Sequence, residues 1–193
     1  MSAAAALLLG LGVFRGGQAV LGLSSHADVL AGELWDSDAY MRLVRLEALL
    51  DGGEWWQQAV ARSNAPLGET LHWARPLDLL LLLGALPLAP WLGLKPALFA
   101  WGATLSPLLG IACLSLTAWQ ARRWLPGAAQ PPLLILFGLQ PALAATFSVG
   151  RPDHHALLLL ALAAGLAVLQ GLALRPCRRA GAGRGAGPCR VDQ

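Results

Sequence analysis

Long apolar runs alternate with polar segments along the chain, and their lengths predict membrane-spanning helices, since about twenty apolar residues cross a bilayer. Four runs reach or approach spanning length: 3–23, 97–119, 131–149 and 156–174. The run at 77–94 is shorter and contains two prolines, so it is expected to be a partial crossing or an interfacial segment. Residues 24–76 form the one long polar stretch and are expected to be a loop outside the membrane.

The composition agrees with this pattern. Of the 193 residues 56% are hydrophobic and only 13% are charged, and the mean hydropathy is +0.55. These values are typical of integral membrane proteins, and together with the runs they predict an all-α, polytopic transmembrane protein. The formal charge of +3 reflects arginines concentrated in the last nineteen residues. We therefore expect no nucleic-acid partner.

Charge also predicts the orientation of the helices. Arg122, Arg123 and the arginines after residue 174 are expected on the cytoplasmic side. The loop at 24–76 and the short polar stretch at 150–155 then face the same outer side, provided that 77–94 does not cross fully. The expected location is a multi-pass position in a bacterial inner membrane.

The outer loop contains a predicted amphipathic helix that begins near Asp38. Its apolar side carries Leu43, Leu46 and Leu50. Arg42 and Arg45 follow Asp38 by four and seven residues and therefore share its face. Such a face would offer a carboxylate for a metal ion and guanidinium groups for phosphate. A solvated surface helix capped by Asp36 or Asp38 is the alternative.

A second polar stretch, Gly150-Arg-Pro-Asp-His-His155, lies between two apolar runs. We call residues 36–45 and 150–155 the two acidic stations. Ionisable groups are costly beside a bilayer, so their presence needs a reason. Asp153 and His155 are two residues apart and are able to reach one divalent cation. A carboxylate oxygen suits both Mg²⁺ and Mn²⁺, whereas imidazole suits Mn²⁺ better than Mg²⁺. The alternative is a polar helix start capped by Asp153, with both histidines at the lipid headgroups.

The remaining features are less specific. Trp55, Trp56 and Trp73 favour an interfacial aromatic belt over a sugar platform. The three cysteines show no metal-ligand spacing. Residues 175–193 are rich in Arg, Gly and Ala and are expected to be a disordered basic tail. Its abrupt change of composition is also what a frameshifted or truncated end of a longer reading frame would give.

Three motifs together resemble the GT-C class of membrane glycosyltransferases, and in particular the N-terminal part of oligosaccharyltransferase catalytic subunits and their bacterial relatives. They are the stretch Asp36-Ser-Asp-Ala-Tyr-Met-Arg-Leu-Val-Arg45, the stretch Leu71-His-Trp-Ala-Arg-Pro-Leu-Asp78, and Gly150-Arg-Pro-Asp-His-His155. The resemblance covers residues 1–174. The family's later outer loop and its Trp-Trp-Asp-type acceptor motif have no counterpart here, so the chain is expected to be a fragment of such an enzyme.

The resemblance implies a site and a reaction. Asp38 and Asp153 take the catalytic roles, and Asp38, Asp153 and His155 hold Mn²⁺ or Mg²⁺. The residues implied in binding the substrate are Arg42, Arg45, His72, Arg75 and His154. The cation would stabilise the phosphate leaving group of a polyprenyl-phosphate-linked sugar donor during transfer to an acceptor that the sequence does not identify.

Two alternatives stay open on the sequence. A GT-C branch that transfers a single sugar from a polyprenyl monophosphate would use the same first acidic loop. A small non-enzymatic membrane scaffold would use all these polar residues as helix caps and interfaces. A transporter is disfavoured, because the chain has no inverted repeat and few charges within the apolar runs.

Overall fold

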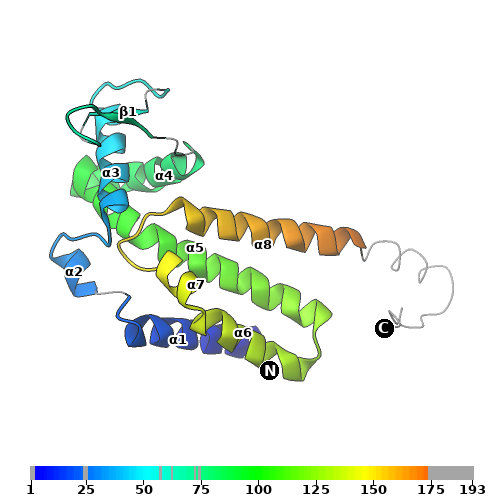
Figure 1. Ribbon diagram of the computed structural model, residues 1–193. Helices are drawn as coiled ribbons and strands as arrows, with labels where there is room; N and C mark the ends of the chain where they lie inside the picture. The colour runs from blue at the N-terminus through cyan, green and yellow to red at the C-terminus, as the bar shows by residue number, and fades with distance from the viewer. Residues whose placement is uncertain are drawn as a thin grey trace.

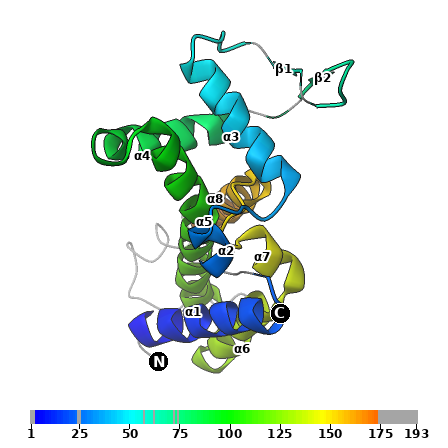
Figure 2. The same cartoon turned by 90° about the vertical axis from the view of Figure 1, so that its left-hand side faces the viewer.

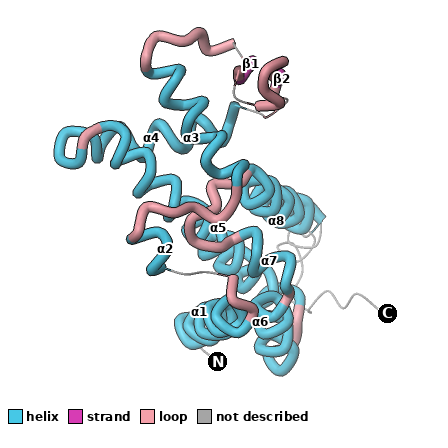
Figure 3. Tube along the Cα trace, turned by 60° about the vertical axis from the view of Figure 1, so that its left-hand side comes forward, coloured by secondary structure: helices cyan, strands magenta, loops and turns pink. Residues whose placement is uncertain are grey.

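The computed structural model describes residues 3–23, 26–56, 58–61, 63–71, 73 and 75–173. This part of the chain is mostly helical, as the sequence predicts (Figure 3). The helices in chain order are α1 (Ala3–Val20), α2 (His26–Leu30), α3 (Ser37–Leu50), α4 (Arg75–Leu92), α5 (Leu94–Trp124), the 3-10 turn η1 (Gly127–Ala129), α6 (Gln130–Leu139), α7 (Pro141–Thr146) and α8 (His154–Ala173). Strands β1 (Ala59–Val60) and β2 (Glu69–Thr70) pair antiparallel between α3 and α4. The expected tail at 175–193 lies outside the described residues.

Three helices in the described part of the chain, α4, α5 and α8, are long and apolar enough to cross a membrane, judged by length and composition. Helix α5 contains the run predicted at 97–119, and α8 covers the run at 156–174 as far as Ala173. With 31 residues, α5 is about 46 Å long, which exceeds the roughly 30 Å of a bilayer's hydrocarbon core.

The run at 131–149 differs from its prediction as one long span. It is divided into the short helices α6 and α7, and Gln140 between them is extended, with ψ of 113°. Pro141 explains the break, because its ring excludes the preceding residue from the α-helical region and supplies no N–H to continue the helix.

Helix α4 is an unbroken helix of 18 residues even though it contains Pro87 and Pro90, whereas the sequence suggested a partial or interfacial segment. It packs on the first part of α5, where the Trp101 indole N–H donates to the carbonyl of Leu80 at 2.9 Å. Helix α8 packs on the later part of α5, where the Gln120 amide donates to the carbonyl of Ala163 at 3.1 Å. The helices α4 and α8 therefore pack against successive stretches of α5.

The polar segments gather at one side of the molecule. Figure 1 shows the start of α1, the turn after α5 and the end of α8 toward one side of the molecule. The helices α2 and α3 and the start of α8 lie toward the opposite side, which faces the viewer in Figure 2. Residues 26–50 and 150–155 are thus at the same end of the bundle.

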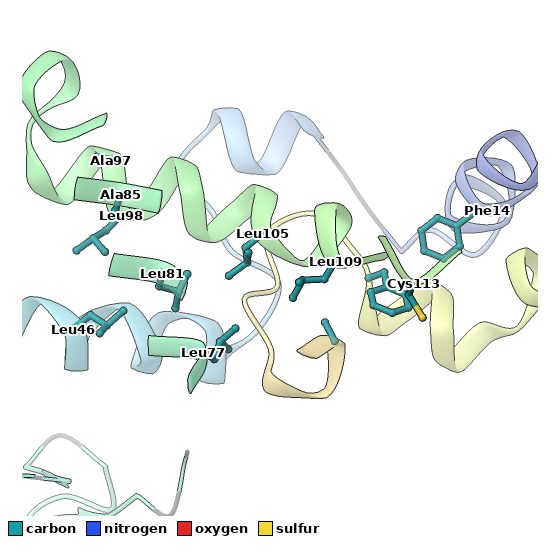
Figure 4. Packing of buried hydrophobic residues seen from close by; sticks show 12 residues of the cluster. Phe14, Leu46, Leu77, Leu81, Ala85, Ala97, Leu98, Leu105, Leu109 and Cys113 are labelled. Carbon is teal, nitrogen blue, oxygen red and sulfur yellow. The ribbon is translucent and has the colours of Figure 1, made fainter. Parts of the chain in front are cut away.

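The main hydrophobic core follows α5 along its length. Figure 4 shows Leu46 of α3 and Leu81 of α4 facing Leu98 and Leu105 of α5, and Phe14 of α1 near Cys113 further along. Leu46 and Leu81 are completely buried. The helices α3 and α4 thus both place leucines against the first half of α5, and Asp78 of α4 contacts Arg42 and Arg45 of α3.

The amphipathic helix predicted in the outer loop is confirmed as α3. Asp36 is its N-cap, since the carboxylate oxygen Oδ1 accepts from the Ala39 N–H at 2.8 Å. Leu43 and Leu46 are buried and Leu50 is half-buried. The helix ends before Gly52, whose φ of 105° favours glycine.

Candidate functional site

Backbone contacts hold the stretch 150–153 between α5 and the residues that precede α3. The Gly150 N–H donates to the carbonyl of Ala103 at 2.8 Å, and its carbonyl accepts from the Trp35 N–H at 3.0 Å. The hydroxyl of Ser106 donates to the carbonyl of Arg151 and accepts from the Asp153 N–H. Gly150 has a φ of 77°, which a residue with a Cβ adopts only with strain. These contacts bring the start of α8 against the start of α3.

The two acidic stations consequently line one small cavity of about 70 Å³, which we call the acidic cavity. From α3 and its cap it receives Asp36, Asp38 and Arg42, and from the other station Arg151, Asp153, His154 and His155. The cavity therefore has room for a cation together with several water-sized ligands.

Within this cavity Asp153, His154 and His155 each offer a ligand atom, and these atoms lie within 4.8 Å of one another. The His154 Nδ1 is 2.9 Å from Oδ1 of Asp153, and the His155 Nδ1 is 3.0 Å from Oδ2. His154 thus belongs to the candidate ligand group, beyond the substrate-binding role that the resemblance implies for it.

Asp38 lines the acidic cavity but is not part of that three-residue group. Its side chain is exposed, and among the described residues it forms no ion pair. The structure therefore brings Asp38, Asp153 and His155 to one cavity, and it gathers the candidate ligand atoms on the side of α8.

The charge state of Asp153 suits a metal ligand. Burial raises the pKa of this carboxyl, but hydrogen bonds from His155 and the charges of both histidines outweigh burial and lower the pKa below its ordinary value of 3.8. Asp153 is therefore ionised at neutral pH, as a carboxylate must be to bind a divalent cation.

Arg151 links the two acidic stations, a role that the sequence analysis missed. Its Nε lies 3.3 Å from Oδ2 of Asp36, and its Nη2 lies 3.6 Å from Oδ2 of Asp153. Because Asp36 also caps α3, the guanidinium ties the start of that helix to the loop before α8. Its position directly before Pro-Asp gave no sign of this partner 115 residues away in the chain.

The second missed residue is Asp78, a completely buried carboxylate in the first turn of α4. Three guanidinium groups contact it. Arg42 lies 3.3 Å away, Arg75 lies 3.1 Å away, and Arg45 makes a short contact to Oδ2. We call these four residues the Asp78 cluster. An unpaired buried carboxylate would be strongly destabilising, and three charged partners offset that cost.

The two arginines of α3, Arg42 and Arg45, line different cavities. Arg42 lines the acidic cavity, where its Nη2 is 3.3 Å from Nδ1 of His154. Arg45 lines a separate cavity of about 190 Å³ next to the hairpin. For both arginines burial lowers the pKa and the neighbouring Asp78 raises it, with a net lowering. The substrate-binding role expected for Arg42 and Arg45 stays a prediction. The structure places the two residues at different cavities, and both pair with the buried Asp78.

Three other residues singled out in the sequence have different outcomes. Arg75 pairs with Asp78 and lies over the Trp55 ring at 4.9 Å, and it does not line the acidic cavity. His72 lies outside the described residues. Trp73, expected in an interfacial belt, is buried beneath Arg42 with its ring centroid 4.6 Å from the guanidinium carbon, which is a cation–π contact.

Comparison of the chain with protein-family models, with curated proteins and with solved structures gives no match.

Proposed function

We propose that this protein is a membrane glycosyltransferase of the GT-C type that transfers a sugar from a polyprenyl-phosphate-linked donor, with Mn²⁺ or Mg²⁺ bound at the acidic cavity. The observation that carries the proposal is the meeting of Asp38 with Asp153 and His155 at one cavity, from stations 115 residues apart in the chain. An acidic cavity at the end of a bundle of membrane-length helices suits a donor whose lipid lies in the bilayer and whose phosphate lies at its boundary.

The residues of the acidic cavity fit a divalent cation. Asp153, His154 and His155 would hold it, with Asp38 opposite, and this set of oxygen and nitrogen donors favours Mn²⁺ over Mg²⁺. When bound, the cation would neutralise negative charge on the donor phosphate. Arg42, fixed by Asp78 on one side, presents a second positive charge at the cavity wall.

The packing of α4 is compatible with both stations facing one side of a membrane. The part of α5 from Ser106 to Trp124 is about 28 Å long and lies beside α8, which is about 30 Å long, so this pair matches the hydrocarbon core. Helix α4 packs on the part of α5 that precedes Ser106 in the chain. In this arrangement we place α4 at or outside the membrane boundary, which would keep residues 26–56 and 150–155 on the same side.

The first test is metal binding by the full chain in detergent, measured by Mn²⁺ electron paramagnetic resonance and by calorimetry. We expect one Mn²⁺ per chain, and Asp153→Asn and His155→Ala should each weaken binding by at least about tenfold, because each removes a proposed ligand atom. Asp51→Asn is the matched control, because Asp51 is an exposed carboxylate at the other end of α3. Equal affinity in all four proteins would refute the metal site.

The second test addresses the donor. A polyprenyl-phosphate sugar in nanodiscs should bind more tightly with Mn²⁺ than with a chelator, and Asp38→Asn should abolish most of that difference.

The Asp78 cluster favours the alternative, a non-enzymatic membrane scaffold, because all three arginines pair with a carboxylate inside the protein. Metal-independent donor binding, or none, would support the scaffold.

A further inference from the structure

Arg122 and Arg123 lie in the last turn of α5, at the side of the molecule opposite the acidic stations. Both side chains are exposed. Figure 1 shows the turn after α5 at the opposite side from α2 and α3. Within the described part of the chain, neither guanidinium group forms a hydrogen bond or an ion pair, and Arg123 contacts an aromatic ring. The charge of both arginines is therefore open to a partner from outside.

The acidic residues are distributed unevenly between the two sides. In the described part of the chain, all of them lie between residues 28 and 78 or at position 153, on the side of α2, α3 and the start of α8 (Figure 1). The segments nearest to the end of α5 in the chain, η1 and α6, contain no carboxylate. Charge complementarity therefore indicates an anionic partner from outside the described residues.

Trp119 holds Arg123 in place from one helical turn earlier. The guanidinium carbon lies 3.7 Å from the centroid of the Trp119 ring, which is a cation–π contact. A guanidinium that lies on a ring keeps its N–H groups in its own plane, so they remain available as donors. Because this contact already restricts the side chain, a phosphate that binds there has less disorder to remove.

The exposed face of α5 continues from the arginines as an apolar surface. Ile111 and Trp119 are 39% and 38% exposed. Ile111, Trp119 and Arg122 share one side of the helix, because their separations are close to whole helical turns. From Arg122 back to Ile111 the helix rises about 16 Å, which matches the roughly 15 Å of one leaflet of the hydrocarbon core. This face therefore joins a basic end to an apolar side that is as long as a lipid chain.

We propose that this face of α5 binds an anionic phospholipid in the leaflet opposite the acidic stations. Arg122 and Arg123 hold its phosphate. One of its acyl chains lies along Trp119 and Ile111. The proposal rests on the membrane placement of α5 and α8 proposed above, but on neither the metal nor the sugar donor. A soluble phosphate ester would satisfy only the arginines, whereas a phospholipid also covers the apolar part of the face.

The test is native mass spectrometry of the full chain in detergent with phosphatidylglycerol and with phosphatidylcholine of the same acyl chains. A chelator removes any cation from the acidic cavity, so the result does not depend on the metal. We expect phosphatidylglycerol to bind at least about tenfold more tightly than phosphatidylcholine. Arg122→Gln together with Arg123→Gln should remove most of that preference. Trp119→Leu keeps an apolar side chain but removes the ring beneath Arg123, and it should weaken phosphatidylglycerol binding several-fold.

Two controls separate this site from a general attraction between positive charge and anionic lipid. Arg178→Gln together with Arg179→Gln removes the same charge from residues 175–193 and should leave the preference unchanged. Lys95→Gln removes an exposed cation at the other end of α5 and should also leave it unchanged.

Three results would overturn the proposal. The first is equal binding of the two lipids by the wild-type chain. The second is a loss of preference in the Arg178 and Arg179 variant as large as that in the Arg122 and Arg123 variant. The third is displacement of phosphatidylglycerol by glycerol 3-phosphate, which would identify a site for soluble phosphate esters instead of a lipid.

Discussion

Replacing the completely buried Asp78 by asparagine should strongly destabilise the protein. The change keeps the shape of the side chain but removes the charge that Arg42, Arg45 and Arg75 contact. The side chains of Arg42 and Arg45 are only 3% and 4% exposed, so water cannot replace the lost carboxylate. Breaking a buried ion pair by removing one partner costs about 3–5 kcal/mol.

The asparagine oxygen still accepts one hydrogen bond, so the loss should fall near the lower end of this range, at about 3 kcal/mol. The measurement is the free energy of unfolding in detergent, from denaturant titration followed by tryptophan fluorescence. Trp73 is a local reporter, because its ring lies 4.6 Å from the guanidinium carbon of Arg42.

The matched control is Asp51→Asn, an exposed carboxylate of the same type at the C-terminal cap of α3. It should change the free energy of unfolding by no more than about 0.5 kcal/mol. A loss below about 1 kcal/mol for Asp78→Asn would refute the reasoning, because it would mean that the three guanidinium groups are solvated and do not depend on this carboxylate.

Three further predictions concern packing, buried polarity and pH. Gly110→Ala would place a Cβ 2.8 Å from a ring carbon of Phe147 and should cost about 1–3 kcal/mol in unfolding free energy, whereas Gly165→Ala meets nothing within 4 Å and should stabilise α8 by up to about 1 kcal/mol. Gln18→Leu should cost about 1–3 kcal/mol, because the completely buried amide donates to the carbonyls of Ala144 and Phe147 at 3.1 Å. The Phe147 carbonyl would lose this donor, whereas the Ala144 carbonyl would keep the hydroxyl of Ser148. Asp153→Asn should destabilise the protein above about pH 4, since the pKa of this carboxyl is lowered in the folded protein from 3.8. The stabilising contribution of Asp153 is fully present above the pKa that this carboxyl has in the unfolded chain, and it is lost as pH falls through the lower pKa of the folded protein. The difference in thermal unfolding between wild type and variant should therefore disappear at the most acidic pH.

The sequence predicted those elements whose signals are local. The cap at Asp36, the spacing of leucines 43, 46 and 50 and the glycine that follows were enough to place α3. The long helix α5 was predicted from its apolar run, since such a run has few other ways to satisfy its backbone. The prediction failed for 131–149, where average hydropathy outweighed the effect of Pro141 on the residue before it.

The candidate site was predicted only as far as chain order and membrane side allow. The resemblance to GT-C enzymes grouped Asp38 with Asp153 and His155, and all three line the acidic cavity. Asp78 was missed because it stands at the head of an apolar helix, where a carboxylate is commonly a solvated first-turn residue. Its burial depends on α3 lying across α4, which no local pattern reveals.

The protonation of His154 gives a further physical reason for a cation in the acidic cavity. Its Nδ1 lies 2.9 Å from a carboxylate oxygen of Asp153 and 3.3 Å from the Nη2 donor of Arg42. If Nδ1 carries a proton, it suits Asp153 and opposes the N–H of Arg42. If Nδ1 carries a lone pair, it suits Arg42 and faces the negative oxygen of Asp153. Either protonation state leaves one unfavourable contact. A divalent cation bound by the lone pair and the carboxylate together would satisfy both of these groups. It would also displace the Arg42 donor from Nδ1, and Arg42 would keep Asp78 as its partner.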